Sequence, residues 1–165
     1  MPPENLIITA ETAAKKMQRM AYEIVEHNIG ENQIILAGIK GNGLIIAHKI
    51  KQFLANVFEG EILVHEINLD KKDPKKIVIP GKYDFNDKVI IITDDVANTG
   101  KTLSYGVKPF LDFYPKKIQT LVLVERSHRQ FPVSPDYVGL SVSTGLDEKI
   151  IVETADNEVV GAHYE

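Results

Sequence analysis

The sequence contains no cysteine, which excludes disulfide bonds and thiol catalysis and fits a cytoplasmic location. It also has no apolar run near the ~20 residues that a membrane-spanning helix requires. The opening stretch MPPENLIITAE lacks the basic region and apolar core of a signal peptide, so we expect none. The histidines, at positions 27, 48, 65, 128 and 163, include no pair at metal-ligand spacing. These absences predict a cytoplasmic protein that does not act at a membrane.

Arginine is also scarce. Of the 19 basic residues only Arg19, Arg126 and Arg129 are arginine, and the net charge is −4. Proteins that read bases or phosphates favour the guanidinium fork. The composition therefore argues against a protein whose main task is to coat nucleic acid, although a local basic patch could still bind it.

What is present is the composition of one globular domain. The 165 residues are 44% hydrophobic and 25% charged. A chain of this size buries roughly two thirds of its unfolded surface. No internal repeat, low-complexity tract or linker interrupts it. We expect a single domain spanning residues 1–165.

Hydrophobic periodicity predicts alternating helices and strands. Residues 11–28 form the first expected helix, which Gly30 ends and whose apolar face is Ala14, Met17, Ala21, Ile24 and Val25. The later elements are expected at 34–39, 61–67, 88–95 and 117–125 for strands and at 43–58 and 102–113 for helices. Within the last helix, Pro109 must either kink the helix or mark a break.

This alternation predicts an α/β fold with a mostly parallel central sheet and helices on both faces. Ligands of such sheets gather at the carboxyl ends of the strands. Both Gly38–Gly43 and Asp94–Thr102 follow strands at that edge. The shorter segments 68–87 and 126–165 would cap the site.

The stretch VIIITDDVANTGKT, residues 89–102, ends like the phosphate loop of an ATPase. That loop has the form G-x-x-x-x-G-K-[ST], and the position five before Gly100 is Asp95. Without a glycine there, the backbone cannot wrap a triphosphate. The ATPase interpretation is therefore excluded.

The same stretch instead combines two carboxylates with a turn of small residues before a helix. The turn's N–H groups and the helix N-terminus form a cradle for a phosphate, to which Thr99 and Thr102 add hydroxyls and Lys101 a charge. Asp94 and Asp95 would repel that anion unless the ligand also carries hydroxyls or a metal ion. A ribose 5-phosphate meets both conditions. The alternative is that the two acids are only a helix cap and a solvated side chain.

The segment resembles the 5-phosphoribosyl-1-diphosphate (PRPP) motif of type I phosphoribosyltransferases. KKMQRMAYEIVEHNIG, ILAGIKGNG, VLVERSHRQFPVSPDYVG and EKIIVE are similar, in order and spacing, to the pyrimidine-operon regulators that are also uracil phosphoribosyltransferases. The resemblance covers nearly all of residues 11–155. It implies a small hood over the sheet, drawn mainly from 126–165, and a homodimer.

The resemblance also implies roles for individual residues. Asp94 and Asp95 would bind the ribose hydroxyls, and Mg²⁺ would enter with PRPP, with the same two acids as candidate ligands. The 5-phosphate would lie on Val96, Ala97, Asn98, Thr99, Gly100, Lys101 and Thr102. Diphosphate would lie on Lys40, Gly41, Asn42 and Gly43, although GIKGNG could also be only a tight turn. A flap would carry Lys71, Lys72, Lys75 and Lys76 where the family has an arginine.

The acceptor base follows from two departures. Purine-specific members carry an acid at the position of Asn98 and a lysine at that of Ser134, and this chain has neither. The resemblance therefore implies a pyrimidine, uracil first, with specificity coming largely from the backbone of the predicted base pocket. The base pocket would be formed by Arg126, Asp136, Tyr137 and Val138.

Two other functions remain open. The regulators bind messenger RNA on a basic surface, of which this chain keeps Arg126, already assigned to the base pocket, together with Arg19, His128 and Arg129. Other positions of that surface have become Tyr22, His27, Ser134, Leu140 and Leu146, and the loss of several phosphate contacts weakens RNA binding steeply at cellular salt. His128 could equally pack within the hood. A PRPP or nucleotide sensor without efficient catalysis is the other alternative.

Overall fold

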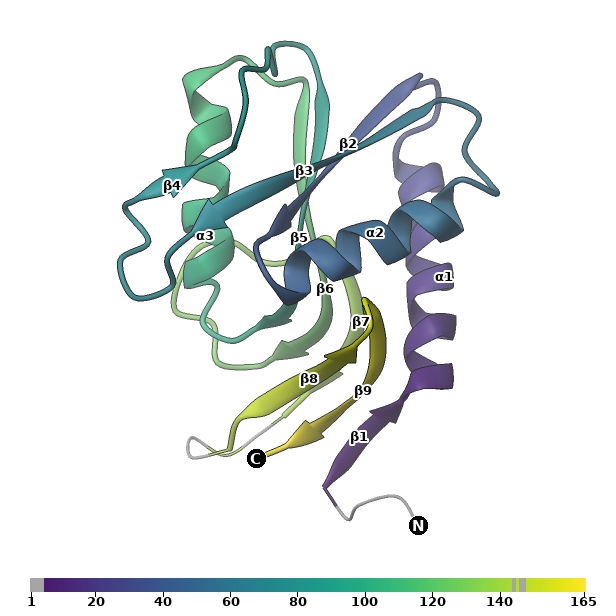
Figure 1. The fold of residues 1–165 in the computed structure, drawn as a ribbon, viewed down its shortest axis with the longest axis vertical. Coiled ribbons are helices and arrows are strands. Elements are labelled where there is room, and N and C mark those ends of the chain that lie inside the picture. The colour runs from purple at the N-terminus through teal and green to yellow at the C-terminus, as the bar shows by residue number, and fades with distance from the viewer. Residues whose placement is uncertain (1–4, 144, 146–147) are drawn as a thin grey trace.

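The computed structural model describes residues 5–143, 145 and 148–165, which form two sheets and their covering helices (Figure 1). The main sheet has six strands in the order β4 (Ile77–Val78), β3 (Glu61–Leu69), β2 (Gln33–Ile39), β5 (Val89–Ala97), β6 (Lys117–Arg126) and β7 (Tyr137–Val142). The small sheet has three, in the order β1 (Leu6–Thr9), β9 (Glu158–Tyr164) and β8 (Ile150–Ala155). The helices are α1 (Ala10–His27), α2 (Asn42–Leu54), α3 (Lys101–Val107) and the 3₁₀ helix η1 (Lys108–Asp112).

The strand directions confirm the predicted fold class. β3, β2, β5, β6 and β7 pair in parallel, and only the two-residue β4 at the edge is antiparallel. In parallel strands the carboxyl ends lie at one edge, which here brings the end of β5 beside the end of β2. The edge that the sequence predicted as the ligand site is therefore built by adjacent strands.

The two faces of the sheet are covered by different helices. Ile34 and Leu36 of β2 pack in the core with α1 and α2, whereas Ile35, Ala37 and Ile39 pack with Leu103, Phe110 and neighbours on the α3 side. This alternation follows from the two-residue period of a strand. Both faces are apolar, as the continuous hydrophobic strands predicted.

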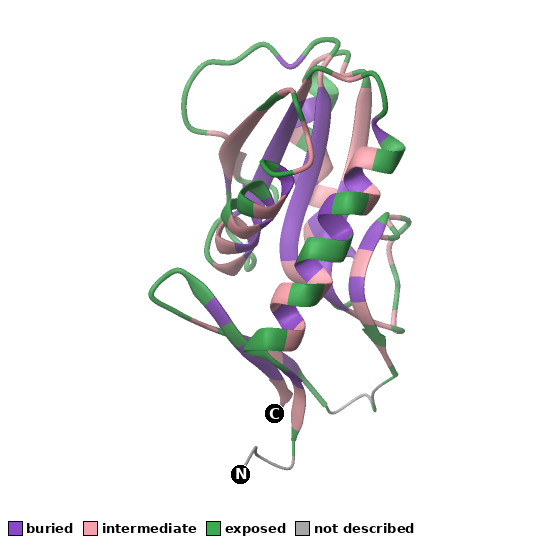
Figure 2. Cartoon of the chain, turned by 90° about the vertical axis from the view of Figure 1, so that its right-hand side faces the viewer, coloured by how far each residue is buried: buried purple, intermediate pink, exposed green. Residues whose placement is uncertain are grey.

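Helix α1 begins at a side-chain cap. One of its faces is buried, as the colours of Figure 2 show. The Thr9 hydroxyl oxygen accepts a hydrogen bond from the Thr12 N–H at 3.1 Å, a standard N-cap. Ala14 and Val25, which were expected on the buried face, are only half-buried. Because α1 contacts both α2 and β7, its buried stripe is centred on Ala13, Met17, Met20, Ala21 and Ile24.

Pro109 marks a break. α3 ends at Val107, and the chain continues as the 3₁₀ helix η1 with the proline in its first turn. Proline has no N–H to donate, so the α-helical ladder cannot continue through it. The single helix expected over 102–113 is thus two short elements.

The segment 126–165 divides between the two sheets. Its first strand, β7, extends the main sheet beside β6, whereas β8 and β9 form the small sheet together with β1 from the chain start. The small sheet lies at one end of the molecule and contains the first strand, β1, and the last, β9 (Figure 1). Among the described residues no helix is both long and apolar enough to cross a bilayer.

Candidate functional site

The site begins where β5 meets the start of α2. The Thr93 hydroxyl donates to the Gly43 carbonyl oxygen at 2.8 Å. A Cβ on Gly43 would lie 2.7 Å from the Thr93 carbonyl oxygen and 3.2 Å from the Asp94 Cα, so only glycine permits this approach. Gly41 precedes it with φ of 95°. The predicted diphosphate loop and the acid pair therefore lie against each other.

The turn after β5 is hydrogen-bonded to the loop that follows β6. Gly100, with φ of 87°, starts α3, and the Thr99 carbonyl oxygen accepts hydrogen bonds from the Gln130 and Phe131 N–H groups at 2.9 and 3.0 Å. Because α3 has only seven residues, its dipole contributes less than the turn's own N–H groups and the Lys101 charge.

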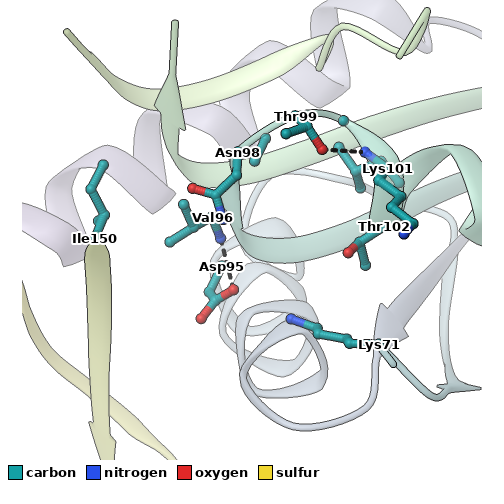
Figure 3. Close-up of a pocket in the computed structure, with 11 residues that line it drawn as sticks. Lys71, Asp95, Val96, Asn98, Thr99, Lys101, Thr102 and Ile150 are labelled. Carbon is teal, nitrogen blue, oxygen red and sulfur yellow. Dashed lines mark hydrogen bonds between the residues drawn. The ribbon is translucent and has the colours of Figure 1, made fainter. Parts of the chain in front are cut away.

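A cavity of about 290 Å³ lies in front of this turn (Figure 3). Every residue predicted to hold the 5-phosphate lines it, together with Asp95 of the acid pair. Figure 3 shows the Lys71 amine pointing toward Asp95 and Ile150 on the opposite side. The lining is Lys71, Asp95, Val96, Ala97, Asn98, Thr99, Gly100, Lys101, Thr102, Leu103 and Ile150.

Asp94 is a buried acid with one oxygen unsatisfied. Only 1% of the residue is exposed; Oδ1 accepts from the Asp95 N–H at 2.9 Å, and Oδ2 has no hydrogen-bond partner among the described residues. Burial, followed by the charge of Asp95, raises the pKa of Asp94 to about 8. The Lys71 ammonium, 3.8 Å from Oδ2, opposes that rise. A buried oxygen that has only this long ion pair and no hydrogen bond among the described residues fits a ligand hydroxyl or a cation.

Asp95 is held differently. Its Oδ1 accepts from the Val96 N–H at 2.7 Å, and its Oδ2 accepts from Asn42 Nδ2 at 3.0 Å. It is half-buried and lines the cavity. The two neighbouring acids thus differ in burial and in hydrogen bonding.

The four lysines of the predicted flap differ in whether they reach the cavity. Lys71 lines the cavity and pairs with Asp94. Lys72, Lys75 and Lys76 are exposed, and Lys76 lies 4.0 Å from Asp73 within the flap. One lysine of the predicted flap is therefore in place in this conformation.

Three of the side chains predicted for the base pocket form hydrogen bonds with other parts of the protein. Arg126 donates to Asn98 Oδ1 at 3.3 Å and to the Gly145 carbonyl oxygen at 3.0 Å, so it stays beside the turn. Asp136 Oδ2 accepts from the Thr120 N–H at 2.8 Å. The Tyr137 hydroxyl donates to Gln119 Oε1 at 2.8 Å, and burial raises the pKa of Tyr137 to about 12.

Tyr137 belongs to the core beneath α1, and Val138 packs on the opposite face. The structure therefore brings Arg126 to the phosphate turn, but not the side chains of Asp136 and Tyr137. Their contribution to a base site would come from backbone groups.

The three residues predicted for an RNA surface are not equivalent. Arg19 pairs with Glu23 and donates to the Val138 and Gly139 carbonyl oxygens at 3.1 and 2.8 Å, which ties α1 to β7. Arg129 is exposed and His128 half-buried in the loop after β6. Leu146 lies outside the described residues.

Two features of the site were not predicted. Ile150 forms part of the cavity wall, and the Asn42 side chain reaches Asp95 rather than standing free in the diphosphate loop. The segment EKIIVE, which begins just before Ile150, carried the only signal in the sequence for the first of these.

Comparison with known proteins agrees with this geometry. Residues 7–158 match the family described as phosphoribosyl transferase domain. The chain is 36% identical over 153 residues to the bifunctional protein PyrR of Streptococcus gordonii, covering 89% of this chain and 88% of that protein. It is 32% identical over 165 residues to the bifunctional protein PyrR of Enterococcus faecalis, covering 94% and 93%.

Solved structures show the same fold. A hypoxanthine-guanine phosphoribosyltransferase from Bacillus anthracis matches with a TM-score of 0.74 at 17% identity, covering 98% of this chain and 99% of that one. The hypoxanthine phosphoribosyltransferase of Trypanosoma cruzi matches with a TM-score of 0.79 at 17% identity, covering 98% of each. The resemblance seen in the sequence is thereby confirmed, and the protein belongs to the type I phosphoribosyltransferase family as a relative of the bifunctional PyrR proteins.

Proposed function

We propose that this protein transfers 5-phosphoribose from PRPP to a pyrimidine base, uracil first, and releases diphosphate. The observation that carries the proposal is the cavity at the end of β5, where an anion-binding turn, the Asp95 carboxylate and Lys71 meet beside the buried Asp94. A ligand that fits all three must carry a phosphate at one end and hydroxyls or a cation at the other.

In this proposal each part of the cavity binds one part of PRPP. The segment from Val96 to Thr102, which ends β5, turns and starts α3, binds the 5-phosphate through hydroxyls, Lys101 and N–H groups after that of Val96, which donates to Asp95. Asp95 and Asp94 bind the ribose hydroxyls. Diphosphate lies toward the loop 40–43 and Lys71, which supply backbone N–H groups and positive charge.

The reaction requires that the base and the ribose be held in position, and it needs no nucleophilic side chain. A base nitrogen forms a bond to C1 of the ribose while the bond from C1 to the diphosphate oxygen breaks, and the N–H proton of the base is released. Positive charge develops on the sugar, and the fixed carboxylate of Asp95 stabilises it.

Magnesium fits the acid pair as a cation carried in with PRPP. Among the described residues no three His, Cys, Asp or Glu side chains form a metal cage, so the chain would not hold the ion alone. The unsatisfied Asp94 Oδ2 and the adjacent Asp95 are the groups that would contact it. When bound, Mg²⁺ would neutralise charge on the leaving diphosphate.

The base assignment rests on Asn98. Its carboxamide cannot take a proton, and its oxygen already accepts from Arg126, so its NH₂ group is left to donate. A base with a carbonyl next to the reacting nitrogen, as in uracil, offers the matching acceptor. The hypoxanthine enzymes that share the fold, at 17% identity, support the fold alone.

The test is uracil-dependent release of diphosphate from PRPP and Mg²⁺. We expect the rate to fall by about a hundredfold or more when Asp94→Asn and Asp95→Asn are combined. The double variant loses the carboxylates that bind the ribose hydroxyls and stabilise the positive charge that develops on the sugar. A panel of purine and pyrimidine bases, assayed in parallel, identifies the acceptor. PRPP binding without transfer to any base would replace the enzyme with a PRPP sensor, and no PRPP binding would overturn the proposal.

RNA regulation is the second candidate, and the PyrR name of the relatives favours it. Against it, Arg19 is engaged by Glu23 and two carbonyl groups of β7. Binding to a structured RNA with a steep salt dependence, unchanged in the double aspartate variant, would support the regulator. A cytoplasmic homodimer is part of the proposal, and light scattering of the purified protein tests the assembly.

A further inference from the structure

The Asn42 side chain joins three separate parts of the molecule. Its Nδ2 donates to Asp95 Oδ2 at 3.0 Å and to the Val152 carbonyl oxygen of β8 at 2.9 Å. Its Oδ1 accepts from the Thr154 hydroxyl of β8 at 2.9 Å. Both amide hydrogens and one oxygen lone pair are thus used within the protein. The group is therefore not free to bind diphosphate, as the loop containing it was predicted to do.

Strand β8 depends on this contact because it is an edge strand. Among the described residues β8 pairs with β9 alone in the small sheet, so its other edge leaves carbonyl groups there without a strand partner. Asn42 bonds one of them, that of Val152. Farther along α2, Lys49 pairs with Glu158 of β9 at 2.6 Å. Besides the apolar core that they share, α2 and the small sheet are thus joined by polar contacts of Asn42 and of Lys49, and of these two residues the described structure brings Asn42 to the site.

The orientation of the amide is fixed by its partners. A carboxylate and a carbonyl only accept, so the NH₂ must face Asp95 and Val152, and the oxygen must face the Thr154 hydroxyl. With Val96 N–H on its other oxygen, Asp95 cannot rotate without losing a hydrogen bond. The strand that holds Asn42 also carries Ile150 into the cavity wall.

We propose that Asn42 is a positioning residue, which orients Asp95 toward the ribose and makes that orientation depend on where β8 lies. The inference rests on the proposed function for its ligand, PRPP, but the bridge itself exists in the free protein. A shift of β8 changes the cavity wall and the Asp95 carboxylate together.

Four variants test the bridge. Asn42→Asp keeps the size and the acceptor for Thr154 but removes both donors and adds a negative charge beside Asp95. Thr154→Val removes the hydroxyl at constant volume and constant charge, so it tests the bridge without that added charge. Thr154→Ser restores the hydroxyl. Lys49→Gln breaks the distant ion pair with Glu158 and serves as the matched control, since it removes another polar contact between α2 and the small sheet without touching Asn42.

The readout is the KM for PRPP, measured beside kcat and the KM for uracil. We expect Asn42→Asp to raise the KM for PRPP by about tenfold and Thr154→Val by about threefold, as for loss of a charged and a neutral hydrogen bond. Thr154→Ser and Lys49→Gln should match the unmodified chain. A merely structural role would lower the active fraction, and so kcat, at an unchanged KM.

An unchanged KM in Asn42→Asp, or an equal rise in Lys49→Gln and Thr154→Val, overturns the inference. If the unmodified chain transfers phosphoribose to no base, the proposed function fails, and the bridge is read from hydrogen exchange of the free protein. Faster exchange of β8 amides in Asn42→Asp and Thr154→Val, but not in Thr154→Ser, supports it. Equal exchange in all variants rejects it.

Discussion

The two ends of the main sheet each carry a polar cavity, and the larger one is not the candidate site. At the amino ends of the strands a cavity of about 410 Å³ is lined by Glu31, Asn32, Gln33, Glu61, Asp87, Lys88 and Val89. At the carboxyl ends the cavity has about 290 Å³. The acids of the amino end are largely paired within the protein: Glu31 with Lys116 at 2.7 Å, and Glu61 with Gln33.

The two ends of the main sheet differ in the groups that lie beside their acidic side chains. The carboxyl end combines a turn of N–H donors, Lys71, and Asp94, one oxygen of which has no hydrogen-bond partner in the described part of the chain. The amino end offers acids and no such turn among its lining residues. In a parallel sheet, loops before helices gather at the carboxyl edge, so that edge can hold an anion and a polar sugar together. The chemical groups that line a cavity, rather than its volume, therefore distinguish the candidate site.

The largest effect should come from crowding the carboxyl end. Gly43→Ala would place a Cβ 2.7 Å from the Thr93 carbonyl oxygen, and we expect it to lower the free energy of unfolding by about 3 kcal/mol. Gly30→Ala near the other end has open space and only a positive φ of 84° to oppose it, so we expect about 1 kcal/mol. Urea denaturation measures both. Equal losses would mean that close packing does not distinguish the two glycines.

The next effect is the pH dependence set by Asp94. Its pKa is about 8 in the fold against an ordinary value of 3.8, so the folded state binds the extra proton and stability falls as pH rises from about 4 to about 8. An asparagine side chain cannot ionise, so Asp94→Asn should gain on the order of 2 kcal/mol at pH 8 and little at pH 4. Urea curves at the two pH values, without ligand, test this. A constant difference between variant and parent at both values would contradict it.

The smallest effects come from the lysines that pair with an acid at each end. Lys71→Ala should raise the KM for PRPP roughly fivefold, since an exposed charge contributes about 1 kcal/mol. Lys116→Ala, at the amino end, should leave that KM unchanged because its partner Glu31 is remote from the site. Steady-state kinetics in low and moderate salt checks both. Similar changes in the two variants would remove the distinction between the ends.

Much of the fold could be predicted because its signals are local. The apolar strands and the break at Pro109 depend on neighbouring residues, and β2, β5 and β6 lie within two residues of their expected bounds. Other features depend on contacts across the chain. The pairing of β1 with β9 and the pairing of β7 with β6 cannot be read from a local pattern. The strands β1 and β7 are short, and they acquire their partners only on packing.

The sequence by itself determined the acid pair and the turn that follows it, because these groups are contiguous and a strand that ends in a tight turn must place them together. Only the tertiary structure decided how the two acids differ. Asp94 lies under packed side chains with one oxygen unsatisfied, while Asp95 is bonded by an amide 53 positions away, which also bonds a carbonyl 110 positions from it. Burial and long-range hydrogen bonds depend on how distant segments pack, and no local pattern contains that information.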